Sequence, residues 1–193
     1  VSSTTKFDQL SNQTLYAHWT ATTYTITYNL DGGTVSSNPN TYNINNYQIY
    51  KNTLYLPYPY SIEDALSWMK NHLDQFNDDR SFEFAITDKM TGKLYGAIGL
   101  SNNQMFNNGE IAYWVGEEYW GNGYATEAAE AIIKFAFVEK GYNKVFARYF
   151  ASNGASGRVL EKLGMRKEGI LREQVKKDNT YVDLVYLGIL KSE

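Results

Sequence analysis

The 193-residue sequence contains no cysteine, and this absence excludes disulfide bonds, thiolate metal sites and a cysteine nucleophile. Histidine is also scarce: His18 and His72 stand alone, without the spacing of metal ligands, so we expect no metal site. No apolar run approaches the length of a membrane span and no apolar signal segment opens the chain, which predicts no membrane partner. A net charge of -3 weighs against a general nucleic-acid-binding surface, so no nucleic-acid partner is expected.

The most informative pattern that is present is a strand, a glycine turn and a helix in direct succession. Residues 109–119 alternate as a strand does, and residues 120–125 hold Gly121 and Gly123. Backbone N–H groups at the start of a helix can bind an anion, and glycine would let a phosphate approach them closely. The spacing fits neither a P-loop nor GxGxxG, and a plain connection is the alternative interpretation. The helix is expected to bury Ala125, Ala128, Ala129, Ile132, Ile133, Ala136 and Phe137.

The remaining patterns predict an α+β (α/β) chain with a mostly antiparallel central sheet flanked by helices. Ser61 is expected to cap a helix with an acidic first turn. That helix would carry Ala65, Leu66, Trp68, Met69 and Leu73. Strands are expected at residues 82–87, 94–100, 110–115 and 144–151, a short helix at 155–163, and a closing antiparallel pair at 165–172 and 181–190.

The glycine turn resembles the acyl-CoA-binding turn of the GNAT superfamily of N-acetyltransferases, written R/Q-x-x-G-x-G/A. Here Trp120 replaces the usual Arg or Gln, and Trp followed by GxGYATEA is similar to the Rim-type branch, the ribosomal-protein N-terminal acetyltransferases and their relatives. The resemblance covers about residues 47–193. It rests on four ordered segments, namely residues 86–100, 110–128, 152–173 and 181–190.

The resemblance implies a GNAT fold and acetyl-CoA as the acetyl donor, used as a co-substrate without a metal. A main-chain N–H near Trp114 or Val115 would stabilise the oxyanion, at a place where family members splay two strands apart to admit the pantetheine arm. The pyrophosphate would lie against Trp120, Gly121, Asn122, Gly123, Tyr124, Ala125 and Thr126.

Two residues are expected to move protons. Glu110 stands where many relatives carry an acidic residue facing the acceptor, and burial there would raise its pKa and make it the base; a Glu exposed at a strand end is the alternative. The Tyr that usually acts as the acid is replaced by Leu160. Asn153 and Ser156 resemble the pair that meets CoA in the Rim branch, with Ser156 near the sulfur, although both side chains also suit a helix cap.

The first 46 residues have a different, β-rich composition. Segments 14–20 and 24–30 alternate as strands do, and Asp31-Gly32-Gly33 predicts a turn. Their order resembles a junction within the Listeria–Bacteroides type of cell-surface repeat. The first strand and helix usual in Rim-type enzymes are absent from the domain at 47–193, so strand 24–30 either replaces the missing edge strand or belongs to a loosely attached tail.

Two functions remain open on the sequence alone. The chain is expected to be an acetyl-CoA-dependent N-acetyltransferase that acts on a protein N-terminus or a small primary amine. The alternative is a catalytically inactive binding or cell-surface module. A cytoplasmic location follows from the donor and from the lack of an export signal, and the chain is expected to be a monomer or a homodimer.

Overall fold

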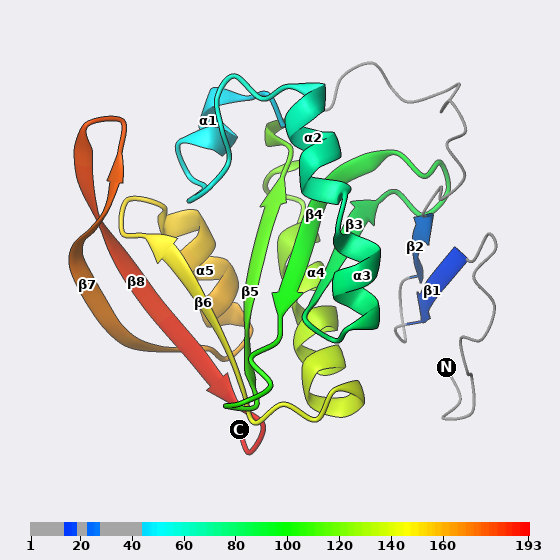
Figure 1. Ribbon diagram of the computed structural model, residues 1–193. Helices are drawn as coiled ribbons and strands as arrows, with labels where there is room; N and C mark the ends of the chain where they lie inside the picture. The colour runs from blue at the N-terminus through cyan, green and yellow to red at the C-terminus, as the bar shows by residue number, and fades with distance from the viewer. Residues whose placement is uncertain (1–13, 19–22, 28–43) are drawn as a thin grey trace.

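The computed structural model describes residues 14–18, 23–27 and 44–193 of the chain. Its central feature is a six-stranded sheet with the strand order β3-β4-β5-β6-β8-β7 (Figure 1). The strands are β3 (Ser81–Thr87), β4 (Leu94–Ser101), β5 (Asn108–Val115), β6 (Lys144–Phe150), β7 (Arg166–Lys177) and β8 (Thr180–Leu190).

All neighbouring strands of this sheet run antiparallel except β5 and β6, which are parallel. The predicted mostly antiparallel sheet is therefore confirmed. A parallel pair needs a crossover connection, and the helix after the glycine turn supplies it between β5 and β6. Strand β7 runs past its predicted end at Arg172, because a bulge at Glu173, with a φ of 49°, lets the chain resume its pairing with β8.

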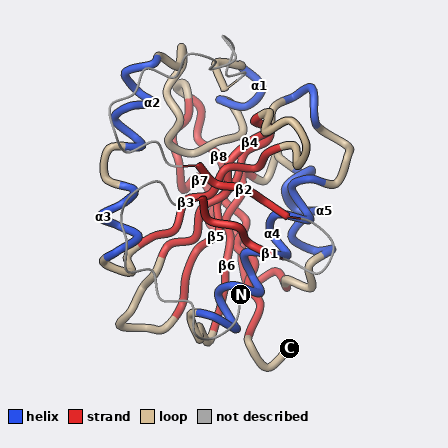
Figure 2. Tube along the Cα trace, turned by 90° about the vertical axis from the view of Figure 1, so that its right-hand side faces the viewer, coloured by secondary structure: helices blue, strands red, loops and turns tan. Residues whose placement is uncertain are grey.

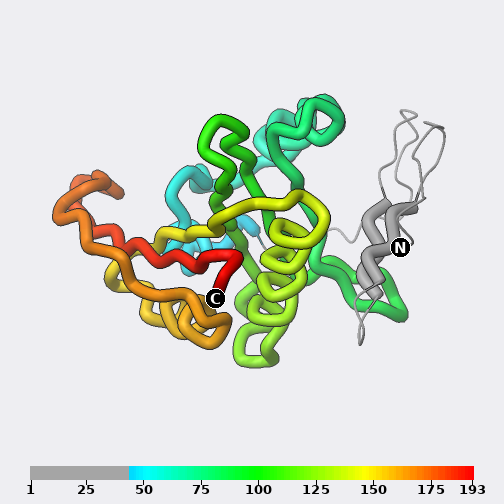
Figure 3. Tube along the Cα trace, turned by 90° about the horizontal axis from the view of Figure 1, so that it is seen from below, coloured from blue at the N-terminus to red at the C-terminus, as the bar shows by residue number. Residues whose placement is uncertain are grey.

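Five α-helices are present in the described residues, and they cover both faces of the sheet. Figure 2 shows α2 and α3 on one side of the strands and α4 and α5 on the other, and the view from below separates the same layers (Figure 3). The helices are α1 (Tyr47–Tyr50), α2 (Ile62–Met69), α3 (His72–Asn77), α4 (Tyr124–Lys134) and α5 (Gly154–Lys162). No helix in the described part of the chain is both long and apolar enough to cross a membrane.

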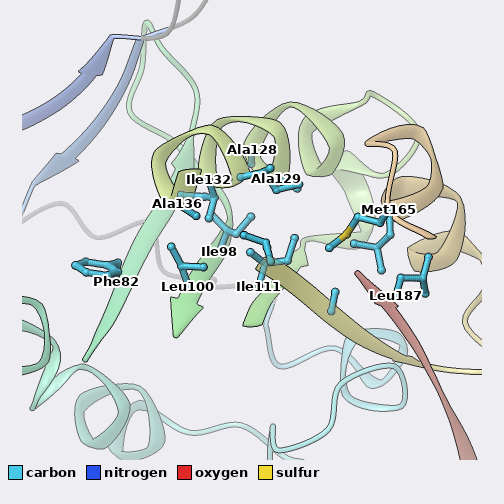
Figure 4. Close-up of a cluster of buried hydrophobic side chains, with 14 of the residues drawn as sticks. Phe82, Ile98, Leu100, Ile111, Ala128, Ala129, Ile132, Ala136, Met165 and Leu187 are labelled. Atoms are coloured by element: carbon cyan, nitrogen blue, oxygen red, sulfur yellow. The ribbon is translucent and has the colours of Figure 1, made fainter. Parts of the chain in front are cut away.

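The main core lies between α4 and the sheet (Figure 4). Leu100 of β4 and Ile111 of β5 are almost completely buried beneath the helix, and each such side chain contributes roughly 1.5–3 kcal/mol by leaving water. The predicted inward face of α4 is confirmed at Ala128, Ala129, Ile132, Ile133 and Ala136, while Ala125 and Phe137 pack at its margin. The helix ends in a π-helical turn at Phe135–Glu139.

The single helix predicted from Ser61 to Leu73 is wrong, because the chain forms two short helices there. Ser61 does cap α2, through a capping box with Asp64. Asn71, however, leaves the helical region with a φ of -110° and a ψ of 6° and starts α3. No residue of α2 is buried, so its apolar side chains Leu66, Trp68 and Met69 do not form the buried face that the sequence suggested. Helix α1 was not predicted.

The N-terminal segment contributes two short strands. Strands β1 (Thr14–His18) and β2 (Thr23–Thr27) pair antiparallel, which confirms both strand predictions in their main part. Within the described residues they form a two-stranded sheet of their own. Replacement of the missing edge strand by segment 24–30 stays a prediction. The predicted turn at residues 31–33 lies outside the described residues.

Candidate functional site

Strands β5 and β6 part in the middle of the sheet. Their pairing covers only Asn108 to Glu110 on β5 and Lys144 to Phe146 on β6, although β5 continues to Val115 and β6 to Phe150. Backbone groups that would have joined two strands are thus left facing a widening gap. A separation of this kind, beside a glycine turn, is what the resemblance to the GNAT superfamily implies for the passage of a pantetheine arm.

The alternation of hydrogen bonds identifies which groups face the gap. The Gly116 N–H donates to the Tyr95 carbonyl directly across from it on the β4 side, and hydrogen-bonded pairs alternate along an antiparallel ladder. The backbone of Trp114 therefore faces β4, whereas the N–H groups of Tyr113 and Val115 point toward β6. The Val115 carbonyl already accepts a hydrogen bond of 2.7 Å from Trp120 Nε1. Of the two predicted oxyanion donors, Val115 has the suitable direction.

The glycine turn presents its backbone to open space. Gly121 and Gly123 have φ values of 79° and 85°, and a Cβ placed on either would meet no atom within 4 Å. Gly123 is the N-cap of α4, and in the described part of the chain no side chain caps the N–H groups of the first turn, to which Tyr124, Ala125 and Thr126 belong. The positive end of the helix dipole lies at the same place. The turn is therefore suited to bind an anion.

Two side chains of the turn shape it from within. Trp120 Nε1 ties the turn to the end of β5, and the Asn122 amide donates to the carbonyls of Tyr119 and Trp120 at 3.0 and 3.1 Å. Tyr124 stacks near Tyr95, with ring centroids 4.8 Å apart. Trp120 and Asn122 thus fix the conformation with their side chains, and any phosphate contact they make must come from the backbone.

Helix α5 begins with the predicted pair. Asn153 Oδ1 accepts from the Ser156 N–H at 3.3 Å, and Asn153 Nδ2 donates to Ser156 Oγ at 3.0 Å. The capping interpretation is therefore confirmed, and because Ser156 Oγ accepts here, its own hydrogen remains available for donation. Leu160, which stands where the resemblance places the usual Tyr, is buried in the core.

Two tyrosines that sequence reasoning missed reach the same helix turn. The Tyr113 hydroxyl donates to the Ser156 carbonyl at 3.4 Å, and the Tyr149 hydroxyl lies against Gly157, where a Cβ would come within 2.6 Å of it. Burial raises the pKa of Tyr113 to about 12, so its hydroxyl stays protonated at neutral pH. Their positions on the two strands that part were the only available signal.

Glu110 is partly buried and forms an ion pair that the sequence did not predict. Arg148 Nε and Nη2 bind its two carboxylate oxygens at 2.6 and 2.7 Å. The same contact raises the pKa of Arg148. Both carboxylate oxygens therefore have a guanidinium partner. Glu110 is thus not the water-exposed side chain at a strand end that was the alternative interpretation.

Glu83 of β3 is a second partly buried carboxyl group on the side of the sheet that carries Glu110. It pairs with Gly99 of β4, and a Cβ at Gly99 would collide with the Glu83 carboxylate, so this carboxylate lies directly over the glycine. Burial raises the pKa of Glu83 to about 7. Sequence reasoning passed over Glu83, because a single Glu in an alternating strand is indistinguishable from a solvated one.

Within residues 14–18, 23–27 and 44–193, no group of three His, Asp or Glu side chains is placed to hold a metal ion. His72 is buried, and burial lowers its pKa. Its ring contacts Trp68 edge-on, with centroids 4.4 Å apart. His72 therefore has a packing environment rather than a ligand set.

Comparison with known proteins gives consistent matches. The model of the acetyltransferase (GNAT) domain matches residues 38–166. The chain is 32% identical over 132 residues to the uncharacterized N-acetyltransferase YoaA of Bacillus subtilis. This alignment covers 68% of this chain and 75% of YoaA. The chain is 27% identical over 120 residues to the ribosomal protein uS5-alanine N-acetyltransferase of Escherichia coli, covering 61% of this chain and 62% of that protein.

A solved structure has the same fold. The crystal structure of the microcin C7 self-immunity acetyltransferase MccE, in complex with acetyl-CoA and AMP, superimposes with a TM-score of 0.68 at 17% identity, covering 77% of this chain and 82% of that chain. None of these matches supports the cell-surface repeat resemblance of the N-terminal segment. Most of that segment lies outside the described residues.

Proposed function

The chain belongs to the GNAT acetyltransferase family and is an acyltransferase, and from this premise we propose that it transfers an acetyl group from acetyl-CoA to a primary amine. The observation that carries the proposal is the uncapped, two-glycine start of α4 beside the gap between β5 and β6. The start of α4 offers N–H groups to a pyrophosphate. The gap between β5 and β6 offers a passage and an N–H donor to the thioester.

Each part of the site has a task in this reaction. The backbone from Trp120 to Thr126 would hold the pyrophosphate, and the Val115 N–H would donate to the carbonyl oxygen as negative charge develops on it. Asn153 orients Ser156, whose hydroxyl is free to donate to the departing sulfur. Bound acetyl-CoA supplies the acetyl group itself, so no covalent enzyme intermediate is needed.

The acceptor is proposed to be a protein N-terminal amine. The Rim-type motifs and the match to the uS5-alanine N-acetyltransferase favour this class over a free small amine. A cytoplasmic location is proposed as well, because the proposed donor is acetyl-CoA. The experiment below tests the acceptor directly.

Isothermal calorimetry with acetyl-CoA tests the donor. We expect a single site with micromolar affinity, and no heat at high micromolar acetyl-CoA would contradict the proposal in favour of an inactive module. Release of free thiol is then followed with butylamine and with tripeptides that carry a free N-terminal amine. A higher kcat/KM for the tripeptides supports the protein acceptor, and equal values would contradict it.

Glu110→Gln tests the proton acceptor that the sequence suggests. If Glu110 takes the proton, the substitution lowers kcat/KM by about 100-fold or more and removes the acidic limb of the pH–rate profile, whereas a Glu110 that only positions the acceptor leaves this limb in place. The ion pair with Arg148 gives a second expectation, a loss of stability, since removing one partner leaves the guanidinium without its carboxylate. An unchanged pH–rate profile in a folded Glu110→Gln protein would count against the assignment.

A further inference from the structure

The carboxylate of Glu83 lies in a row of the sheet that leads to the gap between β5 and β6. By their register, Glu83, Gly99 and Ala112 form one row across β3, β4 and β5. The row ends at the gap, because β5 loses β6 just after Glu110. Gly99 has no side chain and Ala112 only a methyl group. No bulky side chain of these three residues therefore separates the carboxylate from the gap.

The sheet face is open at the Ala112 end of this row. Ala112 is exposed although it belongs to a central strand, while its neighbour Ile111, which points to the other face, is completely buried. Adjacent strands lie about 4.8 Å apart, so a carboxylate above Gly99 is roughly one strand spacing from Ala112. An amine resting on Ala112 would thus have the carboxylate on one side and the gap between β5 and β6 on the other.

The other carboxylate on this face is differently placed. Both carboxylate oxygens of Glu110 accept hydrogen bonds from the Arg148 guanidinium, in a bidentate ion pair. We propose that Glu83, rather than the Glu110–Arg148 pair, accepts the proton of the acceptor ammonium, and that the pair positions the acceptor. This assignment rests on the proposed acetyltransferase function and names a catalytic residue for it.

The proton balance is simple. The acceptor ammonium gives one proton to a Glu83 oxygen, the amine lone pair forms the C–N bond as the C–S bond breaks, and the second proton lost by nitrogen ends on the sulfur. Glu83 then releases its proton to water. A carboxyl group suits this task when its pKa is near the working pH, as burial makes it for Glu83.

Other titratable groups near β3 must be separated from Glu83 in a pH experiment. Burial lowers the pKa of His72, so this side chain is uncharged at neutral pH. The described titratable side chains of the elements packed on β3 are His72 and Asp74 of α3 and Tyr95 of β4, and beyond β4 lie Glu110 and Arg148. Burial raises the pKa of Glu83 to about 7, so its ionisation is expected in the neutral range.

The test compares Glu83→Gln with Glu83→Asp and with Glu130→Gln, a change on the exposed side of α4. The kcat/KM for two tripeptides whose amines differ in pKa is measured from pH 5.5 to 9. In the wild type, the acidic limb of the kcat/KM profile should lie near pH 7 for both tripeptides. We expect Glu83→Gln to lower kcat/KM by about 100-fold at pH 7.5 and to remove this limb. Glu83→Asp should keep the limb, and Glu130→Gln should match the wild type.

The outcomes separate this assignment from the function it rests on. Acetyl-CoA affinity of Glu83→Gln, measured by calorimetry, should equal that of the wild type, which shows that the variant is folded. Wild-type turnover together with an unchanged limb in Glu83→Gln would overturn the Glu83 assignment alone. Absence of acetyl-CoA binding and of turnover in the wild type would overturn the proposed function as well.

Discussion

Replacing Gly123 by alanine is expected to raise the Kd for acetyl-CoA by roughly 30-fold, which corresponds to about 2 kcal/mol, the value of a hydrogen bond to a charged group. Gly123 caps α4 with a φ of 85°, and the space where its Cβ would project is empty of protein atoms. In the proposed complex a phosphate lies there. A methyl group would push the phosphate away from the N–H groups of the first helical turn, without colliding with the protein itself.

The control for this prediction is Gly141→Ala. Gly141 also has a positive φ, of 70°, and a Cβ there would also meet nothing within 4 Å. Alanine at either position has the same left-handed backbone, at a cost of roughly 1–2 kcal/mol in stability. Gly141 lies in the loop before β6, away from the turn. Equal melting temperatures with unequal acetyl-CoA affinities would support the site, whereas equal affinities would contradict it.

Local patterns were sufficient for most of the framework. The strands were predictable because alternating apolar residues allow one side of a strand to enter the core, as with Val145 and Ala147 of β6. The inward face of α4 followed from the helical period in the same way. The two glycines were informative because the turn requires a positive φ at both.

The errors arose where local and tertiary effects compete. The spacing of Leu66, Met69 and Leu73 suits one amphipathic helix, yet the chain turns at Asn71 and leaves α2 without a buried residue. Asparagine has a low helix propensity and so permits such a break, although the Asn71 side chain forms no capping hydrogen bond within the described residues. The spacing of apolar residues therefore indicated helical structure correctly. It did not indicate where the helix would end or which residues would cover its apolar face.

The missing parts of the site depend on contacts between strands. The pairing of Glu110 with Arg148 joins residues 38 positions apart, and the position of Glu83 above Gly99 depends on the register of β3 against β4. Neither the ion pair nor the strand register is encoded in a short motif. The sequence thus located the donor-binding turn, whereas the charge arrangement on the acceptor side required the fold.

Glu83→Gln is expected to stabilise the protein at pH 8 by up to about 3 kcal/mol, because the pKa of Glu83 is about 7 in the folded chain against an ordinary value of 4.5, and each unit is worth about 1.4 kcal/mol. The cause is burial, which disfavours the charged carboxylate. The folded state binds the proton more tightly than the unfolded state. Stability associated with Glu83 is therefore complete below pH 4.5 and is lost as the pH rises through 7.

Glutamine has nearly the same shape and no charge, so it removes this penalty. Urea unfolding of Glu83→Gln and wild type at pH 5 and pH 8 measures the effect: the difference in unfolding free energy should be small at pH 5 and largest at pH 8. Glu130→Gln, an exposed change, should show no such pH dependence. A gain in stability joined to a loss of turnover in the same variant would be the behaviour of a catalytic carboxylate held at a cost to the fold. A loss of stability at pH 8 would instead show that the charged form of Glu83 is favoured in the folded protein, and would remove the physical basis for its neutral-range titration.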